Sequence, residues 1–278
     1  MGYSLNANVR MLFNNVLRGP ALAYRDMRLL CLSAVFNSTG FMGENVALGW
    51  VVLQLTDSPF MVGAAFGVRL APSFFFGLVA GAIADNVDRR ILMRALDVCI
   101  ASASASLGLL IFFDVVQVWH LFVLSFISGS MYTTYHTLRQ SFAYDIVGPA
   151  NVVNGLALVS LGVRSGGIIG SLAVGFLLDA YGADMAYFML SASYVFSAIA
   201  LMFIHSRGQA APVARQPVLR NSFDKLTTGL REFGAEIRRN NTLLTLTILT
   251  GAVEVLGFSH QALLPSIARD TLGVGSEG

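Results

Sequence analysis

The sequence predicts an all-α membrane protein. Of its 278 residues, 55% are hydrophobic and only 12% are charged, whereas ordinary soluble domains are roughly 25% charged. The apolar residues form long runs, and a bilayer-spanning helix needs about 20 such residues. Strands with open edges cannot satisfy their backbone groups in lipid, so we expect these runs to be helices. The expected spans are residues 28–54, 59–84, 92–113, 118–143, 152–178, 184–205 and 242–264.

Lysine and arginine are distributed unequally between the two sets of loops. The N-terminal segment, the loop at 85–94 and the segment 206–241 carry nearly all of them. The opposite loops carry none, except for Arg269 after the last span. Because positive residues stay on the cytoplasmic side, we expect a multi-pass protein of the cell (inner or plasma) membrane with a cytoplasmic N-terminus.

The expected organisation has four parts. A cytoplasmic N-terminal segment, 1–27, precedes a six-helix transmembrane bundle, 28–205. A cytoplasmic linker, 206–241, follows, with an amphipathic helix in which apolar residues recur every three or four positions. Residues 242–278 read as the first span of a second bundle and its following loop. We expect a chain truncated after this seventh span; a genuine seven-span protein is the alternative.

Composition and motifs argue against several other classes of protein. The net charge of +2 gives no electrostatic basis for binding nucleic acid. Cys31 and Cys99 both lie in apolar runs, which indicates neither a disulfide framework nor a metal site. Metal-binding histidine pairs, a nucleophile elbow and a phosphate-binding glycine loop are all missing from the sequence. We therefore expect no enzymatic activity, no cofactor and no metal.

Four ionisable residues lie deep in the expected spans: Glu44, Arg69, Arg164 and Glu254. Such residues are costly in lipid and usually face the protein interior. Glu44 lies 13 residues before Asp57 and Arg69 lies 12 residues after it. An antiparallel hairpin of two helices that turns near Asp57 would therefore bring both side chains to a similar depth in the membrane. This pair is either a structural ion pair or part of a proton or substrate site. Arg164 and Glu254 also fall near the midplane, where transporters keep their sites.

Glycines in the fifth expected span are spaced for close helix packing. Gly162, Gly166 and Gly170 recur every four residues, which leaves a smooth groove for a neighbouring helix. We expect packing there and no ligand.

The loop between the second and third spans carries the pattern Gly81-xxx-Asp85-xxx-Arg89-Arg90. This pattern resembles the signature loop of the major facilitator superfamily, with Asn86 and Asp88 as departures from it. The stretches Gly49–Pro59, Arg69–Pro72 and Leu138–Ser141 resemble the drug- and siderophore-exporter branch, which includes the enterobactin exporters.

The resemblance implies the N-terminal six-helix bundle of the major facilitator fold plus a seventh transmembrane helix. It implies a secondary transporter that works by alternating access, with export of a small amphipathic drug-like or siderophore-like molecule by proton antiport, as a monomer when full length. The four deep charges would converge on a central cavity. The alternatives are a non-transporting membrane receptor or scaffold with the same fold, or an inactive fragment.

The resemblance also implies that the signature loop is a conformational latch, which means a set of charged contacts that hold one conformation closed and break in the other. Asp85 would cap a helix end or approach a helix N-terminus. Arg89 would pair with Asp85 and with Asp145, with Asp97 as another acceptor nearby. The alternative is that Gly81, Arg90 and the rest of the loop only mark topology.

Overall fold

The computed structural model describes residues 19–84, 88–206, 239–240, 242–246 and 248–249, with the backbone alone for 74–84. Within these ranges every long element is a helix and no strand occurs, which confirms the all-α class. The elements are the 3-10 helix η1 (Pro20–Ala23) and the α-helices α2 (Arg25–Thr56), α3 (Pro59–Ala84), α4 (Arg89–Phe112), α5 (Val118–Ala180) and α6 (Ala183–Met202). The predicted linker helix and most of the predicted seventh span lie outside the described residues.

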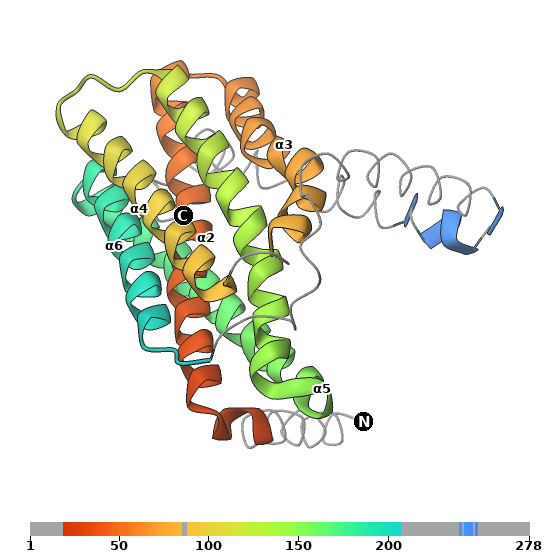
Figure 1. The fold of residues 1–278 in the computed structure, drawn as a ribbon. Helices are drawn as coiled ribbons and strands as arrows, with labels where there is room; N and C mark the ends of the chain where they lie inside the picture. The colour runs from red at the N-terminus through yellow and green to blue at the C-terminus, as the bar shows by residue number, and fades with distance from the viewer. Residues whose placement is uncertain (1–18, 85–87, 207–238, 241, 247, 250–278) are drawn as a thin grey trace, which may run out of the picture.

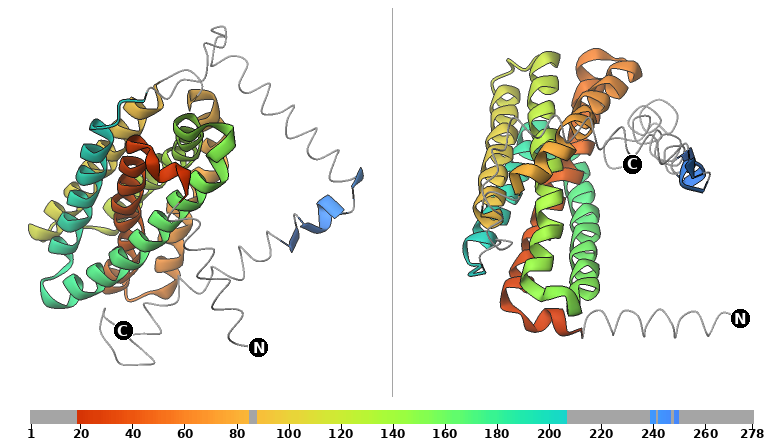
Figure 2. Two further views of the ribbon diagram at one scale, coloured as in Figure 1. Left: turned by 90° about the horizontal axis from the view of Figure 1, so that it is seen from below. Right: turned by 45° about the vertical axis from the view of Figure 1, so that its right-hand side comes forward.

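Helix α5 covers two predicted spans, because a sharp bend divides it. Gly148 has φ 70° and ψ 175°, which is not helical, and Pro149 follows it. Glycine adopts a positive φ at little cost, and proline has no N–H to continue the helical hydrogen bonds. The chain therefore turns back at this point, and the second part of α5 runs back into the bundle from its lower end (Figures 1 and 2).

Helix α2 runs through the middle of the bundle. In Figure 1, α4 and α6 lie to one side of it, and α3 and α5 lie to the other. Helix α2 contacts α3, α5 and α6, while α4 packs on α5 and α6. The start of α2, the bend of α5 and the end of α6 lie at the lower end in Figure 1. The first turn of α2 at this end includes Arg25 and Arg28, which the charge pattern assigns to the cytoplasm.

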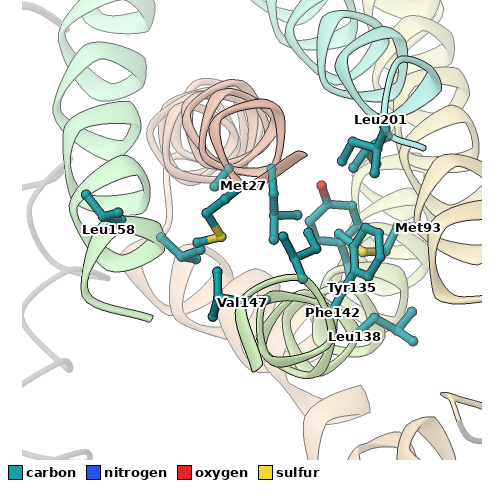
Figure 3. Close-up of a cluster of buried hydrophobic side chains, with 14 of the residues drawn as sticks. Met27, Met93, Tyr135, Leu138, Phe142, Val147, Leu158 and Leu201 are labelled. Atoms are coloured by element: carbon teal, nitrogen blue, oxygen red, sulfur yellow. The ribbon is translucent and has the colours of Figure 1, made fainter. Parts of the chain in front are cut away.

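The apolar interior at this lower end draws side chains from four helices. Figure 3 shows Met27 of α2, Met93 of α4, Leu201 of α6 and five residues of α5 around one volume: Tyr135, Leu138, Phe142, Val147 and Leu158. All of these are less than a tenth exposed. A second apolar cluster, around Leu48, Leu107, Leu121 and Leu190, fills the opposite end. Polar side chains occupy the interior between the two.

The glycines of α5 lie directly against α2. A Cβ at Gly166 would overlap the carbonyl oxygen of Val35, and one at Gly170 would overlap that of Thr39. At Gly162 a Cβ would lie 3.1 Å from the carbonyl oxygen of Cys31. The two backbones are thus close enough for side chains of α2 to bond to α5 carbonyls: Ser38 Oγ donates to Val163 O over 2.6 Å.

Three of the described helices are long and apolar enough to cross a membrane, namely α4, α5 and α6. Helix α2 has 32 residues but contains buried polar residues, among them Ser33, Asn37, Thr39 and Glu44. These residues lower its hydropathy because they serve the interior of the bundle instead of facing lipid.

Candidate functional site

One face of α2 carries the polar groups of the interior. Ser33, Asn37, Gly40 and Glu44 are spaced by four, three and four residues, which places them on the same side of a helix. Ser33, Asn37 and Glu44 are each 0% exposed. Two separate polar clusters form along this face, one around Glu44 and one around Asn37.

In the first cluster, Glu44 forms a two-pronged ion pair with Arg69 of α3. Arg69 Nη1 lies 2.8 Å from Glu44 Oε1, and Arg69 Nη2 donates to Glu44 Oε2 over 3.0 Å. The two residues are 0% and 1% exposed. The predicted contact between them is therefore confirmed. A planar guanidinium that matches both oxygens of a carboxylate is the strong form of such a pair.

Helix α6 and the aromatic ring of Phe41 complete this cluster. Tyr194 donates its hydroxyl to Glu44 Oε2 over 3.2 Å. Gly40 makes room for this tyrosine, because a Cβ there would lie 2.6 Å from the ring. The Arg69 guanidinium lies over the Phe41 ring, 4.7 Å from its centroid. The charge of Arg69 is thus balanced by an anion and covered by an aromatic face.

A half-open cavity of about 480 Å³ adjoins the ion pair. Phe41 and Tyr132 form one wall as parallel rings with centroids 3.4 Å apart. Gly129 allows α5 to approach α3 here, since a Cβ would overlap the Arg69 carbonyl oxygen. The lining joins rings, an aliphatic side chain and hydroxyl groups: Phe41, Arg69, Leu70, Ser73, Gly129, Tyr132, Thr133, His136 and Thr137.

The second cluster surrounds Asp97 of α4, which is 0% exposed. Asn37 Nδ2 donates to Asp97 Oδ1 over 2.8 Å, and Ser197 Oγ of α6 donates to Asp97 Oδ2 over 2.7 Å. The sequence suggested Asp97 as an acceptor for Arg89. The structure instead gives Asp97 two neutral donors, because its side chain points toward α2 and α6.

The start of α4 is tied to its neighbours by its two arginines. Arg89 Nη1 bonds to Asp145 Oδ2 of α5 over 2.6 Å, as the sequence led us to expect. Arg90 Nη1 donates to the carbonyl oxygen of Ile204, beyond α6, over 2.6 Å. Asp88, one of the departures from the signature loop, caps α4 by accepting from the backbone N–H of Arg90.

The remaining residues of the predicted site are not gathered at these clusters. Arg164 of α5 has an exposed side chain, so it is not buried with Glu44 and Arg69. Gly81 lies in the last turns of α3, in the part given as backbone alone. Asp85 and Glu254 lie outside the described residues.

The sequence reasoning missed Tyr194, Asn37 and Ser197 as partners of the buried acids. A signal for them was present. Tyr187, Tyr194 and Ser197 lie seven and three residues apart in an otherwise apolar segment, and such spacing puts them on one helix face. A polar face on a membrane helix usually points inward, and the matching face of α2 should have suggested a partner.

Comparison with known proteins places this chain in a family. The sequence profile of a family described as transmembrane secretion effector matches residues 20–277. The chain is 24% identical over 212 residues to multidrug resistance protein MdtG of Salmonella arizonae, covering 74% of this chain and 48% of that protein. It is 23% identical over 266 residues to macrolide efflux protein A of Streptococcus pyogenes, covering 95% of this chain and 60% of that protein. The chain thus spans about half to three-fifths of the length of these relatives.

Proposed function

Because this chain belongs to the transmembrane secretion effector family of the major facilitator superfamily, we propose that it serves secondary transport. The protein would export a small amphipathic molecule across the cell membrane in exchange for protons. It would do so as a multi-pass protein with a cytoplasmic N-terminus. The observation that carries the proposal is the cavity beside the buried pair of Glu44 and Arg69.

The lining of this cavity suits an amphipathic molecule. The stacked rings of Phe41 and Tyr132 offer a flat apolar surface, against which an apolar body can pack. The hydroxyl groups of Ser73, Thr133 and Thr137 offer donors and acceptors a short way along the wall. Binding pockets for small molecules combine these features, with few polar groups setting the orientation. Macrolides and lipophilic dyes have this chemistry, and two relatives are named for multidrug resistance and macrolide efflux.

The ion pair would hold the wall of the cavity in place. It joins α2 to α3 at the point where both helices contribute to the lining. Breaking it leaves a charge without a partner in the interior, so the pair fixes the packing of these helices strongly. We propose that Arg164 and Glu254 also take part in transport or proton coupling, separately from this pair. Arg164 would do so from its exposed position on α5, and Glu254 from the predicted seventh span.

The latch of Arg89 and Asp145 would stabilise one of the two conformations of an alternating-access cycle. It links the start of α4 to α5 just before the bend at Gly148. A charged contact that exists in one state and not in the other shifts the balance between them.

The experiment uses the full-length protein reconstituted in lipid vesicles. A pH gradient is imposed, and the flux of a radiolabelled macrolide and of a fluorescent amphipathic dye is measured. In parallel, exchange of labelled for unlabelled compound is measured without a gradient. We expect the wild-type protein to perform both, and Glu44→Gln to lose both, because it disturbs the cavity wall.

The matched control is Asp179→Asn, which removes an exposed carboxylate near the far end of α5 and should leave both activities unchanged. Binding of the compounds without flux would instead support the receptor or scaffold reading. If neither binding nor flux is found with the wild-type protein, the proposed export of amphipathic molecules is wrong.

A further inference from the structure

Asp97 is a buried acid whose hydrogen-bond partners in the described part of the chain are neutral. It takes its two hydrogen bonds from an amide of α2 and a hydroxyl of α6, Asn37 and Ser197. Ser197 also lies 2.9 Å from Ser33 Oγ and 3.2 Å from the hydroxyl of Tyr135. Ser33 and Tyr135 are themselves joined over 2.7 Å. Four helices therefore meet at one sealed hydrogen-bond network.

The partners of Asp97 can serve either protonation state of the carboxyl group. A hydroxyl both donates and accepts, and an amide carries a donor on one atom and an acceptor on the other. Asn37 presents Nδ2 to the acid, while its Oδ1 is buried with no hydrogen-bond partner among the described residues. If the amide turned over, this oxygen would accept a proton carried by Asp97. The orphaned acceptor thus has a use in the protonated state and none in the ionised one.

Arg139 is a buried cation close to this network. It lies one helical turn beyond Tyr135 on α5 and is 1% exposed. Its Nε and Nη1 have no hydrogen-bond partner in the described part of the chain. Its guanidinium lies 5.6 Å from the centroid of the Tyr135 ring, and it is near enough to act electrostatically on Asp97. Tyr135 and Arg139 are the titratable groups that face Asp97 from the described helices packed around it.

We propose that Asp97 is a proton-binding site inside the bundle, distinct from the pair of Glu44 and Arg69. A proton taken up from water converts the carboxylate to the neutral acid, and its release back to water restores the carboxylate. Arg139 balances the ionised form, and Asn37 with Ser197 accommodates both forms. The assignment of this proton to transport rests on the proposed function, whereas its binding does not.

The first test detects the proton directly. Infrared difference spectra of the reconstituted full-length protein are recorded as the pH is changed. We expect a carboxylic-acid carbonyl band that appears on acidification, is absent in Asp97→Asn and remains in Glu44→Gln. In Arg139→Gln the band should persist to higher pH, because the charge that favours the carboxylate is gone. A spectrum of Asp97→Asn that matches the wild type at every pH would overturn the proposal.

The second test separates proton coupling from cargo binding. Asp97→Asn should lose flux driven by a pH gradient but keep exchange without a gradient, whereas Glu44→Gln should lose both. Ser197→Ala, which removes one donor and leaves the acid, should shift the pH at which driven flux is half-maximal. Full gradient-driven flux in Asp97→Asn would contradict the role in transport. If the wild-type protein transports nothing, the proposed function fails, while the infrared result still decides whether Asp97 binds a proton.

Discussion

Glu44 and Asp97 are both buried carboxylates near the face of α2, but their partners differ in kind. Glu44 is bound by two guanidinium nitrogens of Arg69 and one tyrosine hydroxyl. Asp97 is bound by an amide and a serine hydroxyl. A guanidinium can only donate, so it suits a carboxylate and opposes its protonation. An amide and a hydroxyl suit either form. Burial alone therefore does not tell which acid can carry a proton; the chemistry of the partners does.

The largest loss of stability is expected at Glu44, whose partner Arg69 can only donate hydrogen bonds. Glu44→Gln leaves Arg69 charged and buried without an anion, which should destabilise the protein by about 3–5 kcal/mol. Thermal unfolding of the purified full-length protein, followed by loss of its monodisperse elution peak, measures this change. Replacing both Glu44 and Arg69 by leucine should recover much of the loss. A double variant as unstable as the single one would show that the pair contributes more than charge balance.

The next effect concerns the packing of α5 against α2, the helix that contributes to both clusters. Gly170→Ala places a methyl group on the carbonyl oxygen of Thr39 and should push α2 away from α5. We expect a loss of about 1–3 kcal/mol, the usual range for overpacking, with driven flux reduced as well. The control is Gly63→Ala, where nothing lies within 4 Å of the new methyl group and helix propensity should give a small gain. Equal stability of the two variants would mean that the close approach of α5 to α2 is not needed.

A comparable but more local loss of stability is expected at the ion pair of Arg89 and Asp145. Asp145→Asn weakens the contact with Arg89 and should cost about 1–3 kcal/mol, as for hydrogen bonds to charged groups. Hydrogen–deuterium exchange should rise in the first turns of α4 and in α5 before Gly148, and not around Glu44 or Asp97. Asp179→Asn serves as the control. Uniform exchange throughout the bundle would show that this contact stabilises no particular end.

A smaller loss of stability is expected at Asp97, whose hydrogen-bond donors Asn37 and Ser197 are neutral. Asparagine in place of Asp97 keeps one oxygen that accepts a hydrogen bond, and its N–H can donate to the Ser197 hydroxyl or, once the Asn37 amide turns over, to the orphaned Asn37 Oδ1. Asp97→Asn should therefore cost about 1 kcal/mol or less, well below Glu44→Gln, in the same unfolding assay. If the two variants lose equal stability, the distinction drawn between the two acids is wrong.

The smallest effect is expected at Asp26, which precedes the predicted span that begins at residue 28. Burial acts to raise the pKa of Asp26, but hydrogen bonds from the Ser206 hydroxyl and from the backbone N–H groups of Ser206 and His205 hold it below its usual 3.8. The contribution to stability is thus present above pH 3.8 and is lost as the pH falls through the lowered pKa. Unfolding of the wild type and of Asp26→Asn across this range should converge at the acid end. A gap that persists there would mean that the charge of Asp26 is not what stabilises the contact.

Much of the fold was predictable because its signals are local. Run length and charge distribution placed the helices; Pro59 lies where α3 begins, and Gly148-Pro149 lies where α5 bends. The contact of Glu44 with Arg69 followed from their equal distance to one turn. The expected ion pair of Arg89 with Asp145 followed from a resemblance, and the structure contains this pair.

The sequence by itself determined that this chain forms apolar helices with a few costly charges inside, since hydropathy and helix length depend on neighbours along the chain. Glu44 and Arg69 could be paired from the sequence, but only the tertiary structure decided the partners of Asp97 and the position of Arg164. Asp97 faces Asn37 and Ser197, 60 and 100 residues away, while Arg164 is exposed. These outcomes depend on how each helix is rotated about its axis, and packing against neighbours such as the glycine face of α5 sets that rotation.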